Sequence, residues 1–203
     1  MVSLLERGRG AGASINTWAR VMAAAGEQLV AFAEHAPGAE RPRDIEHVKR
    51  QSSLIAFAIP GGWRALPELA IDPASPRSRS IDVALVRAAT HEAVVAEIWD
   101  WFDDVGAGFR SLDAKRQTLI QRLEAESRGG DPWTVRALYV VRDTRRNHAL
   151  LAEARALFAA RFPGSPQAWL KALTQPECRL PDGDGLLWSD RSGTILRASR
   201  LRG

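Results

Sequence analysis

Two acidic residues stand out because each lies within a short apolar segment. Asp82 occurs in SIDVALV (residues 80–86) and Glu97 in EAVVAEIW (residues 92–99). Carboxylate oxygens are the ligands that Mg²⁺ prefers in proteins, so two such groups on adjacent strands could form a metal centre. Two basic residues, Lys115 and Arg116, follow in the next helical segment. Either could contact a phosphate group or neutralise the two carboxylates.

Helical periodicity decides which of the two basic residues faces the sheet. The apolar stripe of this helix is formed by Leu112, Leu119 and Leu123. At the spacing of an α-helix, Arg116 lies in the middle of that stripe and Lys115 lies on its flank. A charged side chain on a buried stripe needs a partner, and Asp82 or Glu97 could be that partner.

The elements that must position these residues can be predicted from the apolar pattern. Strands are expected over 63–71, 80–86, 92–99 and 133–141, and a terminal hairpin over 185–199. Helices are expected over 14–26, 44–59, 109–126, 144–162 and 165–175. The order after residue 43 predicts an α/β domain with a mixed central sheet flanked by helices.

This order of elements over residues 43–175 resembles the restriction-endonuclease-like fold, the PD-(D/E)xK superfamily. The resemblance implies that Asp82 and Glu97 are the two acidic residues that hold Mg²⁺. It also implies a lysine two positions after Glu97, where this chain has Trp99. Some members of the superfamily take the basic group from the following helix, which here carries Lys115 and Arg116.

The substitution by Trp99 separates two interpretations of the same residues. In one, Asp82 and Glu97 form a metal site, and Lys115 or Arg116 replaces the missing lysine. In the other, these four residues form buried ion pairs in a nuclease-like domain that no longer cleaves. We prefer the second interpretation, because indole cannot offset the charge that develops on a scissile phosphate.

Other polar residues give weaker signals. Glu68 could be a third ligand, although an exposed carboxylate at a strand edge is the preferred interpretation, and Glu46 is expected to be solvated. Asp100, Asp103 and Asp104 could extend a metal site, but acidic residues at that point more often favour the start of a helix. The histidines are expected at the surface. They are His35, His47, His91 and His148.

Arginines and tryptophans could contact nucleic acid. Arg142, Arg145 and Arg146 gather where a helix is predicted to start, which favours a phosphate, but a basic first turn at the surface is the preferred interpretation. Tryptophan side chains can stack on bases. Core packing is the preferred role for those in or beside predicted strands, namely Trp63, Trp99, Trp133 and Trp188.

The first residues carry a second resemblance. Residues 2–26 resemble the closing part of an Xre/Cro-type helix-turn-helix domain, with most of the recognition helix missing. The matching residues are Ser3, Glu6, Gly8, Ser14, Thr17, Val21, Ala24 and Gly26. Nearly the whole chain is similar to the second half of actinobacterial Xre-type regulators, through RSIDVALV, VAEIWDWFDDVG, VVRDTRRN and LFAARFPGSPQAWLKAL. The resemblance implies a helix-turn-helix remnant over 1–36 and a domain over 43–203. The missing head implies either a true start upstream of Met1 or a truncated paralogue.

Composition limits the cellular setting. The single Cys178 allows neither an internal disulfide nor a cysteine-based zinc site, and we expect a reducing, cytoplasmic location without a membrane segment. The net charge of +4 permits a polyanion partner without requiring one.

The resulting functional hypothesis is an accessory domain of an Xre-family DNA-binding transcriptional regulator, with a degenerate nuclease-like site and no cofactor. DNA would be bound mainly through the missing head, and a protein partner is also compatible. The first alternative is a Mg²⁺-dependent DNA endonuclease. The second alternative is an antitoxin-like module that binds another protein.

Overall fold

The computed structural model describes residues 14–27, 29, 43–71, 80–102, 104–127, 131–190, 193 and 196–198. The chain divides into two compact units, Met1–Arg41 and Pro42–Gly203. In the first unit, α2 (Ile15–Ala24) begins where the sequence predicts, because the Ser14 side chain accepts a hydrogen bond from the Thr17 N–H and caps the helix. Ser3, Glu6 and Gly8 of the helix-turn-helix resemblance lie outside the described residues.

The second unit is built on a six-stranded mixed sheet in the order β1-β2-β3-β4-β5-β6. The strands are β1 (Arg64–Ala70), β2 (Ser80–Arg87), β3 (Glu92–Trp99), β4 (Thr134–Arg142), β5 (Gly185–Ser189) and β6 (Leu196–Ala198). Strands β1, β2 and β3 form an antiparallel meander, β4 and β5 continue parallel to β3, and β6 returns antiparallel to β5. The predicted α/β class, mixed sheet and terminal hairpin are confirmed.

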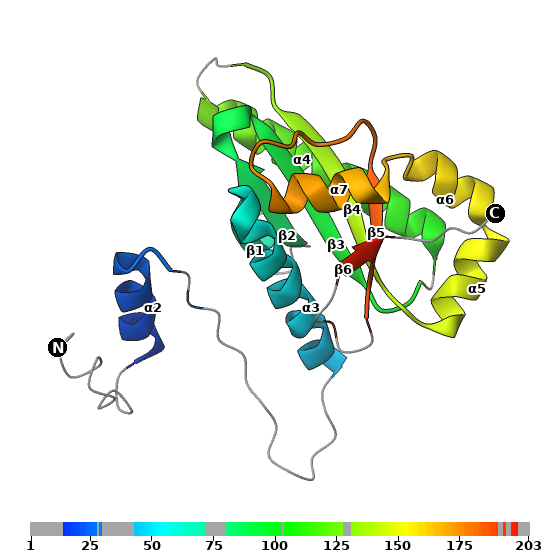
Figure 1. The fold of residues 1–203 in the computed structure, drawn as a ribbon, viewed down its shortest axis with the longest axis horizontal. Helices are drawn as coiled ribbons and strands as arrows, with labels where there is room; N and C mark the ends of the chain where they lie inside the picture. The colour runs from blue at the N-terminus through cyan, green and yellow to red at the C-terminus, as the bar shows by residue number, and fades with distance from the viewer. Residues whose placement is uncertain are drawn as a thin grey trace, which may run out of the picture. The chain divides into compact units, whose positions relative to one another are not determined.

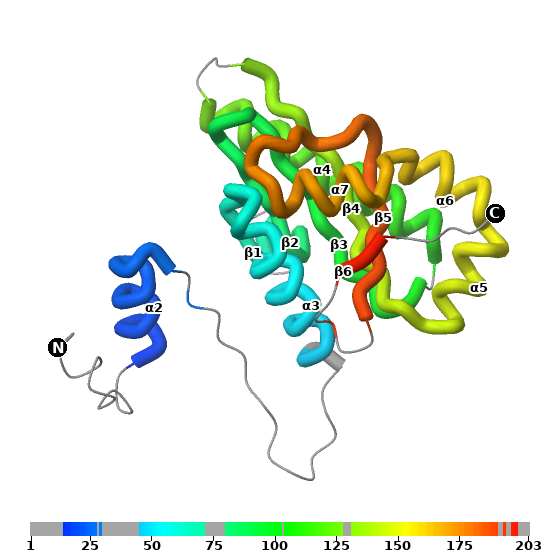
Figure 2. The backbone as a smooth tube through the Cα atoms, viewed as in Figure 1, coloured from blue at the N-terminus to red at the C-terminus, as the bar shows by residue number. Residues whose placement is uncertain are grey.

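Helices cover both faces of this sheet (Figure 1). Helices α3 (Arg43–Ala58) and α7 (Pro166–Thr174) pack on one face, and α4 (Val105–Ser127) packs on the other. The chain reaches the α4 face again with α5 (Arg145–Glu153) and α6 (Arg155–Arg161), as the tube in Figure 2 traces. Two short 3₁₀ turns, η1 (Ile59–Gly61) and η2 (Ala88–Thr90), complete the connections.

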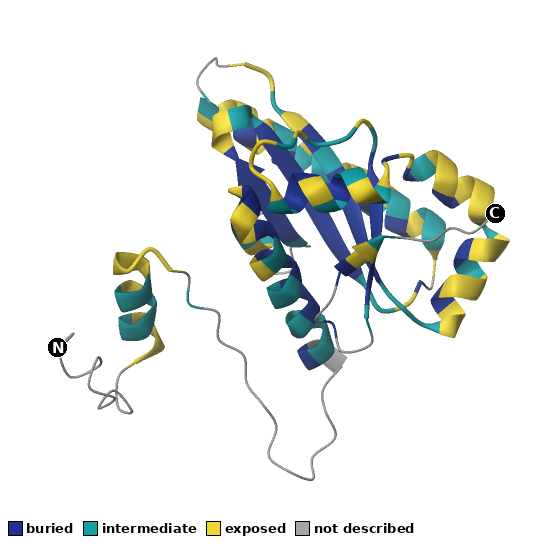
Figure 3. Ribbon diagram, in the orientation of Figure 1, coloured by how far each residue is buried: buried dark blue, intermediate teal, exposed yellow. Residues whose placement is uncertain are grey.

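The alternation of side chains divides the interior into two cores. On β3, Ala93 and Val95 point to the α4 face, whereas Val94 and Ala96 point to the face of α3 and α7. The central strands are therefore buried on both sides, as Figure 3 shows by their dark blue colour. This accounts for the nearly continuous apolar runs in their sequences.

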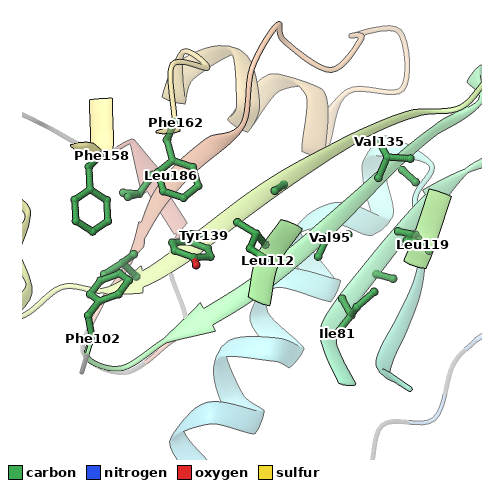
Figure 4. Packing of buried hydrophobic residues seen from close by; sticks show 14 of the residues in the cluster. Ile81, Val95, Phe102, Leu112, Leu119, Val135, Tyr139, Phe158, Phe162 and Leu186 are labelled. Atoms are coloured by element: carbon green, nitrogen blue, oxygen red, sulfur yellow. The ribbon is translucent and has the colours of Figure 1, made fainter. Parts of the chain in front are cut away.

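Aromatic rings fill the α4 face beside Tyr139 (Figure 4). The ring of Tyr139 lies 4.8 Å from that of Phe162 and 5.3 Å from that of Trp99, between ring centroids. Complete burial of such a ring stabilises the fold by about 2 kcal/mol. The core role predicted for tryptophans is confirmed for Trp63 and Trp188, which are buried, and Trp99 also packs against this core.

One predicted helix is divided in the structure. The segment expected to run from 144 to 162 is broken at Ala154, which separates α5 from α6. Its predicted cap is correct, because the Thr144 hydroxyl accepts from the Asn147 N–H. Leu151 of α5 and Phe158 of α6 both reach the α4-side core.

Candidate metal and phosphate site

Asp82 and Glu97 meet at the end of the β2–β3 ladder. The register pairs Val83 with Ala96, so the next residues of the two strands are Asp82 and Glu97. The Asp82 N–H donates to Glu97 Oε1 over 3.4 Å, and Asp82 Oδ2 accepts from the Ile98 N–H over 2.7 Å. The Asp82 carboxylate thus takes the place of a main-chain carbonyl as the acceptor for the Ile98 N–H. Both acidic groups are held by backbone as well as by side chains.

Lys115 of α4 completes this arrangement. Its ammonium nitrogen lies 2.5 Å from Glu97 Oε2, and both side chains are buried. Arg116 instead points to the side of the helix, where it donates to Asp184 over 3.0 Å and to Asp113 over 2.9 Å. The prediction that Arg116 rather than Lys115 lies at the centre of the buried stripe is wrong.

Gly108 explains this correction. It is buried in the same stripe of α4, and a Cβ atom at its position would lie 2.8 Å from the Trp99 ring. Because glycine adds nothing to an apolar pattern, the sequence places the centre of the stripe too far toward Arg116. Including Gly108 moves it toward Lys115, whose long side chain reaches Glu97 from the flank.

Two further groups approach Asp82 from α3 and β1. His47 Nε2 lies 3.6 Å from Asp82 Oδ2. One ligand atom each from His47, Glu68 and Asp82 can be chosen so that all three lie within 4.8 Å of one another. We refer to Asp82, Glu97, Glu68, His47 and Lys115 together as the carboxylate site. The His47 nitrogen and one carboxylate oxygen each from Glu68 and Asp82, at this spacing, form a donor set that fits a divalent cation.

Glu68 is held in an unusual backbone conformation. Its φ is +49°, which costs an L-residue with a side chain roughly 1–3 kcal/mol. Leu66 and Leu69 both pack on the α4-side core although they are three residues apart, so alternation is interrupted at Glu68. Its carboxylate accepts hydrogen bonds from the Gln51 amide and the Ser80 hydroxyl. Neighbouring residues therefore hold a strained acidic group beside Asp82.

Burial makes the site electrostatically unfavourable for two negative charges. Burial, together with repulsion from Asp82, raises the pKa of Glu97 to about 7, although Lys115 opposes this shift. Burial also raises the pKa of Asp82, against the hydrogen bond from Ile98 and the charge of His47. A bound cation would offset both the desolvation and the repulsion. The donor set and its electrostatics thus fit a metal ion on the same residues.

The carboxylate site opens into a surface cavity of about 320 Å³. Its lining includes His47, Asp82 and Glu97, then Trp99 at the end of β3, and Asp100 and Trp101, which follow that strand. Glu68 and Lys115 are not among the lining residues; Glu68 contacts Gln51, and Lys115 contacts Glu97. A ligand that enters the cavity would therefore meet the acidic groups directly.

The aspartates after β3 have separate roles. Asp100 Oδ1 forms a salt bridge with the guanidinium of the buried Arg50 at 2.6 Å. The same oxygen lies 3.6 Å from the Arg142 guanidinium. Asp104 accepts from the Ala107 N–H, and so it acts at the start of α4, as the preferred interpretation predicts. Asp103 lies outside the described residues. Arg142, a proposed phosphate contact, is thus engaged with an acidic residue.

The remaining candidates are dispersed. Arg145 and Arg146 are exposed at the start of α5, and His148 contacts Asp143 at 2.6 Å. His91 lies in a turn against Trp133, with ring centroids 5.2 Å apart. His35 lies outside the described residues, and Glu46 is 3.5 Å from Lys49.

His47 is the site residue whose role the sequence analysis missed. The sequence predicts a surface position for His47 because the four histidines are scattered and lack the close spacing of metal ligands. The available signal was the pair His47 and Gln51, one helical turn apart beside the apolar stripe of α3. In the structure, this pair contacts Asp82 and Glu68.

No helix among the described residues is both long enough and apolar enough to cross a membrane. Comparison of the chain with protein-family models, curated proteins and solved structures finds no match.

Proposed function

We propose that the second unit is a phosphodiesterase that hydrolyses nucleic acid with a divalent metal ion. In this proposal its core is of the restriction-endonuclease-like type. The order of α3, the β1–β3 meander, α4 and the parallel β4 supports that relationship. The observation that carries the proposal is the meeting of Asp82 and Glu97 beside Lys115 in a cavity that solvent can enter.

The residues of the site suggest how a cation would be held. Glu97 offers buried carboxylate oxygens, Asp82 and His47 are half-buried, and Glu68 is exposed. A cation bound there would supply Lewis-acid stabilisation of the negative charge on a phosphate. Mg²⁺ and Mn²⁺ are the candidates, since three of the four donors are carboxylates.

Lys115 supplies the positive charge that Trp99 cannot. Its ammonium reaches Glu97 from α4, so the basic group comes from the helix and not from β3. A positive charge fixed at this position would stabilise the charge that develops on the scissile phosphate. Glu97, with a pKa of about 7, can accept or release a proton near neutral pH.

The proposal is tested with purified protein, Mn²⁺ or Mg²⁺, and labelled single-stranded and duplex DNA and RNA. We expect metal-dependent cleavage that is lost in both Glu97→Gln and Lys115→Met. Glu124→Gln, which removes an exposed acidic group elsewhere on α4, should retain it. Absence of cleavage from every substrate and with both metals would refute the enzymatic function.

A second candidate is an accessory domain of a DNA-binding regulator with a degenerate nuclease-like site. The short, buried contact between Lys115 and Glu97 favours it, because the protein already neutralises this carboxylate without a metal. In that case Asp82→Asn would leave calorimetric titrations with Mn²⁺ unchanged, and no substrate would be cleaved. A protein-binding, antitoxin-like role would share these results but show affinity for a protein and none for DNA.

A further inference from the structure

Trp101 differs from the other tryptophans of the second unit. Its side chain is 36% exposed, whereas Trp63, Trp169 and Trp188 are buried and Trp99 and Trp133 are half-buried. An indole contributes most to stability when it is fully buried, and this one is not. A single exposed apolar residue needs no explanation in itself, so its surroundings decide its meaning.

The surroundings of Trp101 are the cavity of the carboxylate site. Trp101 lines this cavity together with His47, Asp82 and Glu97. An exposed indole therefore lies at the entrance to the groups proposed to act on a phosphodiester.

The segment that carries Trp101 is fixed on both sides. Before it, the Asp100 carbonyl accepts from the buried Asn147 amide over 2.9 Å, and the Asp100 carboxylate pairs with Arg50. After it, Phe102 is buried and stacks on Trp99 with ring centroids 4.7 Å apart. The position of the indole is thus set by the fold, which lowers the entropy cost of stacking it on a ligand.

The chemistry of the cavity lining limits how a nucleic acid could bind. Among the described residues that line it there is no lysine or arginine, and three are acidic. Phosphate contacts from this lining would be unfavourable without a cation. The remaining source of affinity is the aromatic face, which can stack on any base.

We propose that Trp101 stacks on an unpaired base and that the carboxylate site acts on single-stranded nucleic acid. This inference rests on the proposed function and adds its substrate class. Bases within a duplex are already stacked on their neighbours, so an indole beside the site can stack on a base only where that base is unpaired or splayed out. Single-stranded DNA and RNA both present such bases.

The test measures binding by fluorescence anisotropy with labelled oligonucleotides of about 12 nucleotides, single-stranded or duplex, in Ca²⁺, which takes similar oxygen ligands. Gel analysis checks that the oligonucleotides stay intact. We expect wild-type protein to prefer single strands and Trp101→Ala to weaken their binding about 5- to 100-fold. Trp101→Phe should retain most of the affinity. Leu157→Ala, which removes an exposed apolar side chain from α6, should leave it unchanged.

An abasic single strand separates stacking from a general loss of binding. Wild-type protein should bind it as weakly as Trp101→Ala binds the normal strand, and the substitution should cause no further loss. Equal affinity of the wild type and Trp101→Ala for single strands, or an equal loss on the abasic strand, overturns the stacking role alone. Failure of the wild type to bind any oligonucleotide overturns the proposed function as well. Parallel DNA and RNA strands identify which of the two is preferred.

Discussion

The ammonium group of Lys115 lies 2.5 Å from the Glu97 carboxylate, and both groups are buried on the α4 face of the sheet. The free energy needed to remove two charges from water can exceed the attraction between them once they are buried. The ion pair is therefore weak evidence of a role in stability. Glu97 lines the cavity together with Asp82, and the proposed reaction would use the charges of Glu97 and Lys115 there.

Removal of one partner of this pair should be more harmful than removal of both. At a pH above about 7, where Glu97 of the wild type is ionised, Lys115→Met leaves this carboxylate buried without its cation, and we expect the free energy of unfolding to fall by about 3 kcal/mol. The double variant Lys115→Met/Glu97→Gln should recover much of that loss, because no uncompensated charge remains. Urea denaturation measures both. Arg122→Ala, on an exposed part of α4, should change stability by less than about 0.5 kcal/mol. A double variant as unstable as the single one would contradict this account.

The acidic residues should determine metal affinity. Asp82→Asn and Glu97→Gln each remove a negative charge at nearly constant shape. We expect each substitution to lower Mn²⁺ affinity by about 10- to 100-fold. Isothermal titration calorimetry gives the dissociation constants directly. Glu124→Gln serves as the matched control, since it removes an equal charge far from the cavity lining. Unchanged binding in both site variants would exclude the metal centre.

His47 should tune the choice of metal. An imidazole nitrogen favours first-row transition metals over Mg²⁺, which prefers oxygen ligands. We therefore expect His47→Ala to weaken Mn²⁺ binding by about tenfold and Mg²⁺ binding much less. Competition titrations with the two ions measure this ratio. If the ratio stays the same, His47 is not a ligand, and its 3.6 Å approach to Asp82 is only an ion pair.

The raised pKa of Glu97 predicts how stability depends on pH. The folded state holds this proton up to about pH 7, against a usual value of 4.5, because burial and the charge of Asp82 disfavour the ionised form. The resulting stabilisation is complete below the usual value and is lost as the pH rises through about 7. In EDTA, the melting temperature should therefore fall by a few degrees between about pH 5 and about pH 8.

Glu92 has a lowered pKa: burial would raise it, but hydrogen bonds from Thr90, the Leu180 N–H and Arg87 outweigh that effect. The stabilisation that Glu92 contributes is therefore lost only at more acidic pH. Glu92 should not affect the change in melting temperature between about pH 5 and about pH 8. Glu97→Gln should flatten the decline, and Mn²⁺ should reverse it at the upper end of the range. A melting temperature that rises over the same range in EDTA would show that Glu97 is ionised in the folded state.

The sequence identifies the strands of this fold because their patterns are simple. β3 and β4 are buried on both faces, so their apolar runs are nearly continuous, and Asp82 and Glu97 interrupt such runs. A charged residue on the buried stripe of a helix needs a partner, and this requirement predicts that Lys115 or Arg116 meets these carboxylates. The choice between those two failed because Gly108 carries no apolar signal.

The rest of the site depends on contacts that no local pattern contains. His47 reaches Asp82 only because α3 crosses the end of β2, far away in sequence. The positive φ of Glu68 interrupts the alternation of side chains along β1. A glycine or asparagine at this position would have indicated such an angle, but a glutamate does not. Long-range geometry decides both features.

Glu68 offers a test of whether backbone strain is retained for function. Glycine adopts a φ of +49° without strain, whereas alanine does not, and both substitutions remove the carboxylate. We expect Glu68→Gly to be more stable than Glu68→Ala by about 1 kcal/mol in urea denaturation. Both variants should lose Mn²⁺ affinity equally, because the ligand is absent in each.

This pair of variants separates two reasons for an acidic residue at that position. If Glu68→Gly is as stable as the wild type while Mn²⁺ binding and cleavage decline, then the strain is tolerated for the sake of the site and not for folding. The hydrogen bonds from Gln51 and Ser80 would then serve to orient the carboxylate toward Asp82. A Glu68→Gly variant that binds Mn²⁺ as the wild type does would remove Glu68 from the metal site and leave Asp82, Glu97 and His47 as its ligands.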